Sequence, residues 1–265
     1  MRRTPFAIVV LALVAVTLAG CGGGGGGANA PSGAVSVVDG VTGASLAGTT
    51  VSARPGDPVT VERAGYLRRD TIVARDAILT LWPLTVDETF VRTLVYSDVP
   101  VRNRLSRWPG TTVTVPRDFP GEVVELVRPW VTLVPSDSPA LTIAIDPDNA
   151  RFAQFSADTI AYAFRQVSDT DARILSVQLF FKSERDLRFP GNLAHEMGHA
   201  LGLQHSPRPQ DVMFPTTART TLVFSPDERV LLTMMYAHRR PGQVAPDNDQ
   251  ALGQPATGVI RSAVP

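Results

Sequence analysis

The chain has 265 residues, with 25 basic and 25 acidic side chains and therefore no formal net charge at pH 7. This balance gives no basic footprint for a polyanion, which argues against a nucleic-acid partner. The length suits one domain of ordinary size with a smaller partner, and the single cysteine, Cys21, excludes an intrachain disulfide framework.

The amino terminus has the organisation of an export signal. Arg2 and Arg3 precede an apolar run at residues 6–19, which is shorter than the roughly 20 residues that a membrane-spanning helix needs. The run ends in Leu-Ala-Gly-Cys, which resembles the bacterial lipobox. This resemblance implies that residues 1–20 are a lipoprotein signal peptide and that Cys21 is lipidated. An ordinary signal peptide with an unrelated cysteine is the alternative.

An unbroken glycine run, residues 22–27, follows the cysteine and predicts a flexible tether within a linker of residues 21–33. Firm membrane anchoring takes two or more acyl chains. The lipoproteins that this signal resembles carry that number of chains. The resemblance therefore implies attachment to a membrane through lipid on Cys21. We expect a location in the bacterial cell envelope outside the cytoplasm, and the outer membrane and a periplasm-facing membrane both stay open.

The pattern of residues 34–86 predicts a small all-β, sandwich-like module. Short apolar runs alternate with turn signals such as Asp39-Gly40. The candidate strands are residues 34–38, 59–61, 71–73 and 78–82. The segment resembles the small β-sandwich modules related to carboxypeptidase regulatory domains. Nothing in it has the pattern of a catalytic site, so a spacer or packing partner is the favoured role.

Residues 87–242 are expected to form an α+β domain. Apolar residues at helical spacing predict a helix over residues 121–128, which Pro129 shortens or kinks. The candidate strands are residues 111–115, 141–145, 160–167 and 174–181. A further helix is placed at residues 193–202, with Asn192 as its cap.

Residues 195–205, which begin in the second of these helices and continue past its end, have the pattern of a zinc site with a general base. His195 and His199 are four apart, so on a helix they share a face and can bind one ion at about 2.0–2.1 Å. Gly202 favours a left-handed turn that ends the helix and returns His205 as a third ligand. Three protein ligands leave one position open, which is typical of catalytic zinc. Glu196 stands where a carboxylate can reach water on the metal.

The stretch resembles the metzincin clan of zinc endopeptidases. The segments GHALGLQHS and DVMFP are most similar to its matrixin branch. The resemblance implies a metzincin-like catalytic domain, with a twisted mixed β-sheet, an active-site helix and a C-terminal helix. It also implies that Met213, in the methionine turn, forms an apolar floor beneath the metal. In the family an edge strand binds the extended peptide, and residues 160–167 are the candidate.

The sequence departs from the family in three places. Many matrixins hold a second, structural zinc, but His238 is the only histidine outside the motif. Some metzincins have a tyrosine two residues after the turn methionine, where this chain has Pro215. The cysteine that blocks zinc in many family zymogens has no counterpart, because the only cysteine is Cys21. One catalytic Zn²⁺ is therefore expected. Ca²⁺ is unsupported, because the loop aspartates match no calcium pattern.

The last predicted helix begins at Ser225, which is followed by a proline and, three residues on, by Glu228. Its buried stripe is expected to be Val230, Leu231, Met234 and Met235. His238 falls at its carboxyl end, where a basic residue suits the helix dipole, so a ligand role is disfavoured. Residues 243–265 are polar with scattered prolines and are expected to be a disordered tail.

The leading hypothesis is a zinc endopeptidase that cleaves a protein or peptide substrate, with Glu196 as general base and then general acid. A second hypothesis is a lipid-anchored binding or adhesion protein of the envelope whose protease domain is vestigial. A third is hydrolysis of a non-peptide amide in a cell-wall component. Zinc content and turnover of a general protein substrate, measured together, separate the first two.

Overall fold

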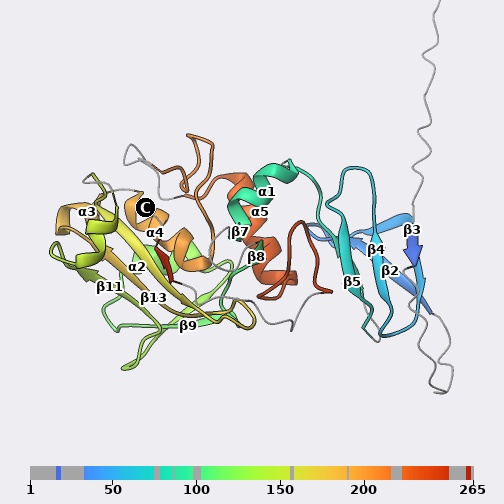
Figure 1. The fold of residues 1–265 in the computed structure, drawn as a ribbon, viewed down its shortest axis with the longest axis horizontal. Helices are drawn as coiled ribbons and strands as arrows, with labels where there is room; N and C mark the ends of the chain where they lie inside the picture. The colour runs from blue at the N-terminus through green and yellow to red at the C-terminus, as the bar shows by residue number, and fades with distance from the viewer. Residues whose placement is uncertain are drawn as a thin grey trace, which may run out of the picture. The chain divides into compact units, whose positions relative to one another are not determined.

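The computed structural model describes residues 16–18, 33–74, 78–85, 87–97, 103–155, 158–189, 191–215, 223–250 and 261–263. The chain divides into two compact units, Met1–Pro83 and Leu84–Pro265 (Figure 1). Cys21, the glycine run and most of the expected signal peptide lie outside the described residues. Among the helices that are described, none is long and apolar enough to cross a membrane.

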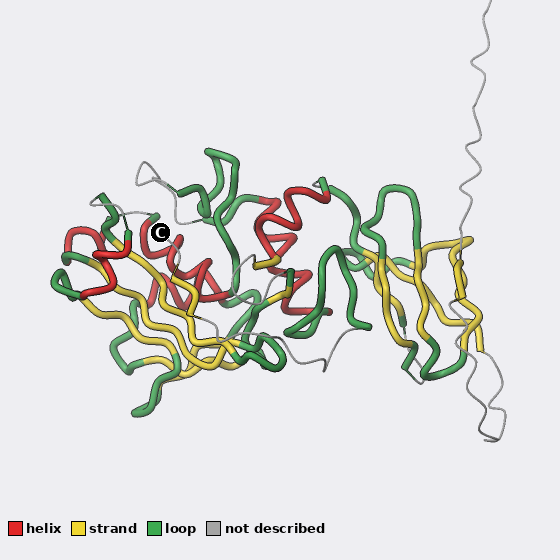
Figure 2. Tube along the Cα trace, in the orientation of Figure 1, coloured by secondary structure: helices red, strands yellow, loops and turns green. Residues whose placement is uncertain are grey.

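The first unit is built from strands, as the sequence predicts (Figure 2). Its elements are β1 (Val16–Leu18), β2 (Gly33–Asp39), β3 (Ser45–Ala53), β4 (Pro58–Val61), β5 (Arg69–Ile72) and β6 (Leu79–Leu81). Within the described residues they form two three-stranded sheets, in the orders β1-β4-β5 and β3-β2-β6. Val35 and Val51 of one sheet share a hydrophobic core with Val59 and Val61 of the other. The unit is therefore a small sandwich-like module.

The second unit combines helices and strands. Its strands are β7 (Tyr96–Ser97), β8 (Arg104–Leu105), β9 (Thr112–Val115), β10 (Thr132–Pro135), β11 (Leu141–Ile145), β12 (Ala161–Val167), β13 (Ile174–Phe181) and β14 (Arg261–Ala263). Its helices are α1 (Glu88–Val95), α2 (Gly121–Val127), α3 (Glu184–Arg188), α4 (Asn192–Leu201) and α5 (Pro226–Thr233), with a 3₁₀ turn η1 (Ala150–Gln154) and a π-helical turn η2 (Met234–His238).

The central sheet of this unit is mixed, as expected for a metzincin-like fold. Its order is β11-β13-β12-β14, with β11 parallel to β13 and β12 antiparallel to it. A parallel pair, β9 and β10, meets this sheet where Ala140 donates its N–H to the carbonyl of Thr114. The bounds of β11 and β13 are those predicted from their alternating apolar residues.

The expectation of an edge strand at residues 160–167 needs correction. A strand does form there, but β12 is paired on both sides. Its far side pairs antiparallel with β14, with Phe164, Arg165 and Gln166 opposite residues 261–263. A local sequence window cannot reveal this, because the pairing joins segments about a hundred residues apart in the chain.

Helix α4 packs against β12 and β13 on one side and against α2 and α3 on others. All ten of its residues are buried. A helix that is covered all round has little freedom to move, so side chains that it carries are held in fixed directions.

Residues 243–250, which belong to the tail expected to be disordered, are ordered. Asp247 is fully buried and forms an ion pair with Arg239, with Nε–Oδ1 and Nη2–Oδ2 distances of 2.6 and 2.7 Å. Gln243 also donates to Asp247, and its own carbonyl accepts the N–H of Leu105 at 2.8 Å. A paired carboxylate stabilises a buried guanidinium, and Asp247 in the stretch 243–250 supplies one here. Its polar composition therefore reflects internal pairing, and disorder is the wrong prediction for these residues.

Candidate metal centre

Helix α4 begins differently from the prediction. Its N-cap is Gly191, which has a φ of 91° and no side chain to cap with, and Asn192 is the first helical residue. The Asn192 amide donates instead to the carbonyl of Asp186 in α3, at 2.9 Å. The left-handed turn at Gly191 redirects the chain from α3 into α4, so Asn192 is already inside the helix and links the two helices.

The three predicted zinc ligands lie together. The rings of His195 and His199, one turn apart on α4, have centroids 4.6 Å apart. The ring of His205 lies 5.2 Å from the first and 4.9 Å from the second. One ligand atom from each of the three residues lies within 4.8 Å of the others. The spacing allows three imidazoles to bind one ion.

Backbone carbonyls fix the tautomer of both helical histidines. The Nδ1 atom of His195 lies 2.8 Å from the carbonyl oxygen of Val212, and that of His199 lies 2.9 Å from the carbonyl oxygen of Leu203. A carbonyl only accepts, so each Nδ1 carries the proton and each Nε2 keeps its lone pair for a metal.

The donor set fits zinc. The Nε2 atom of His199 is buried and has no hydrogen-bond partner among the described residues. A buried polar atom in this state is costly unless an ion or water satisfies it. Three neutral imidazoles are one of the ligand sets that catalytic zinc uses, with its fourth position left for water or substrate.

The surroundings keep His199 neutral. Burial lowers its pKa well below the usual 6.5, and nearby His195, His205 and Arg165 add to this effect. Arg165 is fully buried on β12 and donates to the His199 carbonyl at 3.2 Å, and burial lowers its own pKa to about 10. Since a metal binds the neutral imidazole, this environment favours metal over a proton.

Gly202 ends α4 in the left-handed conformation that the sequence predicts, with a φ of 108°. A Cβ at this position would lie 2.0 Å from the carbonyl oxygen of Ser106. Glycine is therefore required for two reasons, the backbone conformation and the close approach of another chain segment. The turn sends the chain out of the helix and towards His205.

The methionine turn lies against the helix between the ligands. Met213 is fully buried, and a Cβ added to Gly198 would lie 2.1 Å from its Sδ atom. The turn is held by Glu228 of α5, whose carboxylate accepts the N–H groups of Met213 at 2.7 Å and Val212 at 3.2 Å. Glu228 also closes the predicted capping box with Ser225.

Sequence reasoning identified Glu228 only as part of a helix cap. Its second role, anchoring the turn that bears the Val212 carbonyl, can be recognised only in the folded structure. In the structure Glu228 is fully buried at the start of α5, and a buried carboxylate must find donors beyond its own cap.

Glu196 lies on α4 directly after the first ligand, with 5% of its surface exposed. Its side chain therefore has little contact with bulk water. Cys21 lies outside the described residues.

Comparison with known proteins agrees with this geometry. Residues 144–237 match the family model described as Matrixin. The matched segment contains the three histidines, Glu196, Met213 and Glu228. A search among curated proteins found no match. The match and the three converging imidazoles lead to one conclusion, which is that the second unit of this protein carries a matrixin domain with a metzincin-like fold.

Proposed function

We propose that the protein is a zinc-dependent endopeptidase that hydrolyses protein or peptide substrates. The observation that carries this proposal is the convergence of His195, His199 and His205 to within 4.8 Å inside a matrixin domain. The buried Nε2 of His199, which has no partner among the described residues, supports a metal at their centre.

The three histidines would hold zinc, two of them through Nε2. When bound, zinc supplies a Lewis acid that polarises the peptide carbonyl and acidifies water. Glu196 accepts the proton of the attacking water and then gives it to the leaving amine, so one carboxylate serves both steps. Because Glu196 is 5% exposed, bulk water competes little for its proton.

The chain's own contribution is orientation. The carbonyls of Val212 and Leu203 hold the imidazole rings of His195 and His199 through Nδ1. Outer contacts of this kind are worth about 10–100-fold in metal affinity or activity in zinc enzymes. The Val212 carbonyl is in turn held by Glu228, whose carboxylate accepts the N–H of Met213, the N–H of the same peptide unit, at 2.7 Å.

We also propose that residues 1–20 are removed and that lipid on Cys21 anchors the protein in the bacterial cell envelope, with residues 21–33 as tether. The basic start, the short apolar run and the single cysteine support this. Cleavage after residue 20 would remove β1 and leave β4 paired with β5. Labelling of the protein with a radioactive fatty acid, lost in Cys21→Ser, tests the anchor.

Cleavage of a peptide library by the zinc-loaded full-length protein in detergent tests the enzymatic proposal. We expect hydrolysis that a chelator abolishes and added zinc restores. Stoichiometric zinc without cleavage of any peptide would contradict the proposal and favour a vestigial protease domain in an envelope binding protein. Release of product from cell-wall amides alone would assign a different substrate class to the same centre.

A further inference from the structure

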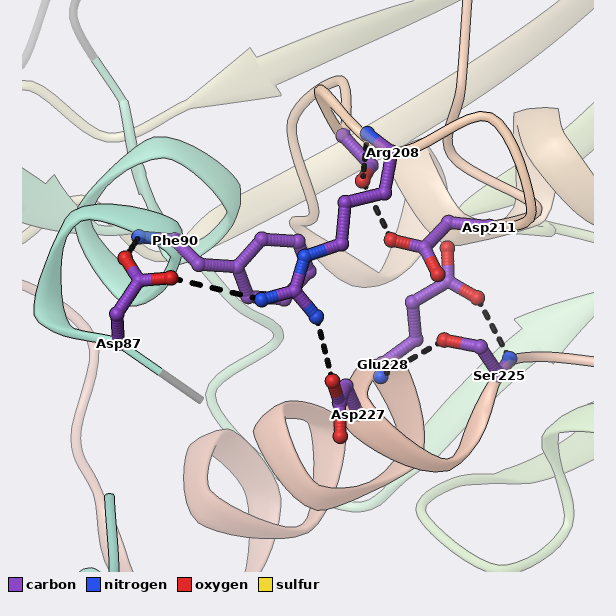
Figure 3. Close-up of polar contacts among 8 residues, drawn as sticks. Asp87, Phe90, Arg208, Asp211, Ser225, Asp227 and Glu228 are labelled. Carbon is purple, nitrogen blue, oxygen red and sulfur yellow. Dashed lines mark hydrogen bonds and ion pairs between the residues drawn. The ribbon is translucent and has the colours of Figure 1, made fainter. Parts of the chain in front are cut away.

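Arg208 lies three residues after the third histidine and joins two helices (Figure 3). Its guanidinium is 2.5 Å from Asp227 in the first turn of α5, as Nη1–Oδ2, and 3.5 Å from Asp87, the N-cap of α1, as Nη2–Oδ2. The same group lies 3.8 Å from the centre of the Phe90 ring on α1. A planar cation held by two carboxylates and an aromatic face has one defined position.

The backbone of Arg208 is tied to the segment that follows the third ligand. Its N–H donates to the Ser206 hydroxyl at 3.1 Å, and that hydroxyl donates to Asp211 at 2.5 Å. The N–H of Ser206 donates to the carbonyl of Met213 at 2.8 Å. Arg208 therefore connects α1 and α5 with the loop that joins His205 to the methionine turn.

His205 differs from the other two ligands in how it is held. His195 and His199 are fixed by α4, whereas His205 lies beyond the end of that helix. On its amino-terminal side, the N–H of Gln204 donates to the carbonyl of Leu94 in α1, at 2.8 Å. On its carboxy-terminal side, Arg208 contacts the start of the same helix. The third ligand thus lies between two attachments to α1.

The two ion pairs of Arg208 are unequal. The side chains of Arg208 and Asp227 are 27% and 33% exposed, whereas Asp87 is 66% exposed. Solvent screens the Asp87 contact more, so Asp227 is the stronger partner. Asp87 also accepts the N–H of Phe90 as the cap of α1, which ties the start of α1 to the same cluster.

We infer that Arg208 is a positioning residue for the zinc centre. It holds the loop that carries His205 against α1 and α5, and its loss loosens the third ligand. This inference rests on the metal centre of the proposed function but not on hydrolysis. Its main consequence is for metal retention.

The test is zinc affinity of the full-length protein, measured by competition with a chromogenic chelator. We expect Arg208→Met to weaken zinc binding about 10-fold, the low end of the effect of groups that orient metal ligands. The zinc affinity of Arg208→Lys should lie between those of the wild type and Arg208→Met, because an ammonium pairs with one carboxylate but lacks the planar fork of a guanidinium. Arg92→Met is the matched control, since Arg92 forms its ion pair with Glu88 within α1.

Two further measurements separate positioning from simple stabilisation. The absorption spectrum of the Co²⁺-substituted protein should change in Arg208→Met and not in Arg92→Met, because it reports ligand geometry. In a double-mutant cycle, Arg208→Met and Asp227→Asn together should weaken zinc binding by less than the product of the single effects.

Unchanged zinc affinity and an unchanged Co²⁺ spectrum in Arg208→Met would overturn the inference, even if the variant melted at a lower temperature. Multiplying effects in the cycle would also overturn it, because Asp227 would then act independently. Peptide cleavage is not a readout here. An inactive wild type that binds zinc would contradict the proposed function and leave the role of Arg208 standing.

Discussion

The thioether of Met213 occupies the space that a side chain at Gly198 would need. A Cβ at residue 198 would lie 2.1 Å from the Met213 Sδ atom and 3.2 Å from both its Cε atom and Cε1 of Phe224. Gly198 immediately precedes the ligand His199. The methionine turn and the zinc helix therefore fit each other at the point where the helix presents its second ligand.

Gly198→Ala should force Met213 out of its place. Overpacking of a buried site costs about 1–3 kcal/mol, and the displaced turn carries the Val212 carbonyl that orients His195. We expect a lower free energy of unfolding and weaker zinc binding. Denaturant unfolding and chelator competition measure the two. Gly121→Ala in α2, where the added Cβ would meet no atom within 4 Å beyond its chain neighbours and its own helix backbone, is the control. Equal stability and zinc affinity in the two variants would contradict the packing argument.

Glu228→Gln should loosen the methionine turn where it is held by α5. The Glu228 carboxylate accepts three backbone N–H groups, from Met213, Val212 and Ser225. A glutamine amide turns one acceptor oxygen into a donor, so at least one buried N–H loses its partner, at a cost of about 1–3 kcal/mol. We expect a lower melting temperature and faster zinc loss to a chelator.

The conservative change Glu228→Asp keeps the charge but shortens the reach, so it should retain more of both properties than Glu228→Gln. If the glutamine variant retained wild-type zinc loss kinetics, the turn would not depend on this carboxylate.

Stability of the zinc-free protein should depend on pH through His199. Burial lowers the pKa of His199 in the folded chain, whereas the unfolded value is 6.5. Between these two values the unfolded chain binds a proton that the folded chain does not. The free energy of unfolding therefore rises with pH up to about 6.5, by at most about 1.4 kcal/mol per pH unit for one group. Urea unfolding in a chelator at several pH values measures this slope.

His199→Gln is the comparison for that slope. The variant lacks the titrating group, so its stability should change less with pH over the same window. Parallel slopes in the wild type and the variant would show that His199 does not account for the acid sensitivity.

The parts of the centre that were predictable from sequence are those encoded locally. His195 and His199 share a helix face because they are four apart, and Gly202 turns the chain because glycine tolerates a positive φ. The capping box of Ser225 and Glu228 formed as predicted for the same reason. In each case a few neighbouring residues determine the geometry.

The parts that escaped prediction depend on residues far apart in the chain. Arg239 and Asp247 pair only because the segment after η2 is buried, and nothing in the composition of the tail indicates this. Arg208 contacts Asp87, which lies 121 residues earlier in the chain. The cap of α4 was misassigned because Gly191 takes a positive φ, which a propensity for Asn192 at the cap position cannot anticipate.

Glu196→Gln separates metal binding from hydrolysis, with zinc content and peptide hydrolysis measured on the same preparation. The substitution preserves the size of the side chain and leaves the three histidines intact, but an amide cannot accept the proton of the attacking water. We expect one equivalent of zinc, as in the wild type, with hydrolysis reduced by at least about 100-fold, the lower end of the contribution of a general base. Wild-type hydrolysis by the zinc-loaded variant would contradict the role of Glu196 as general base.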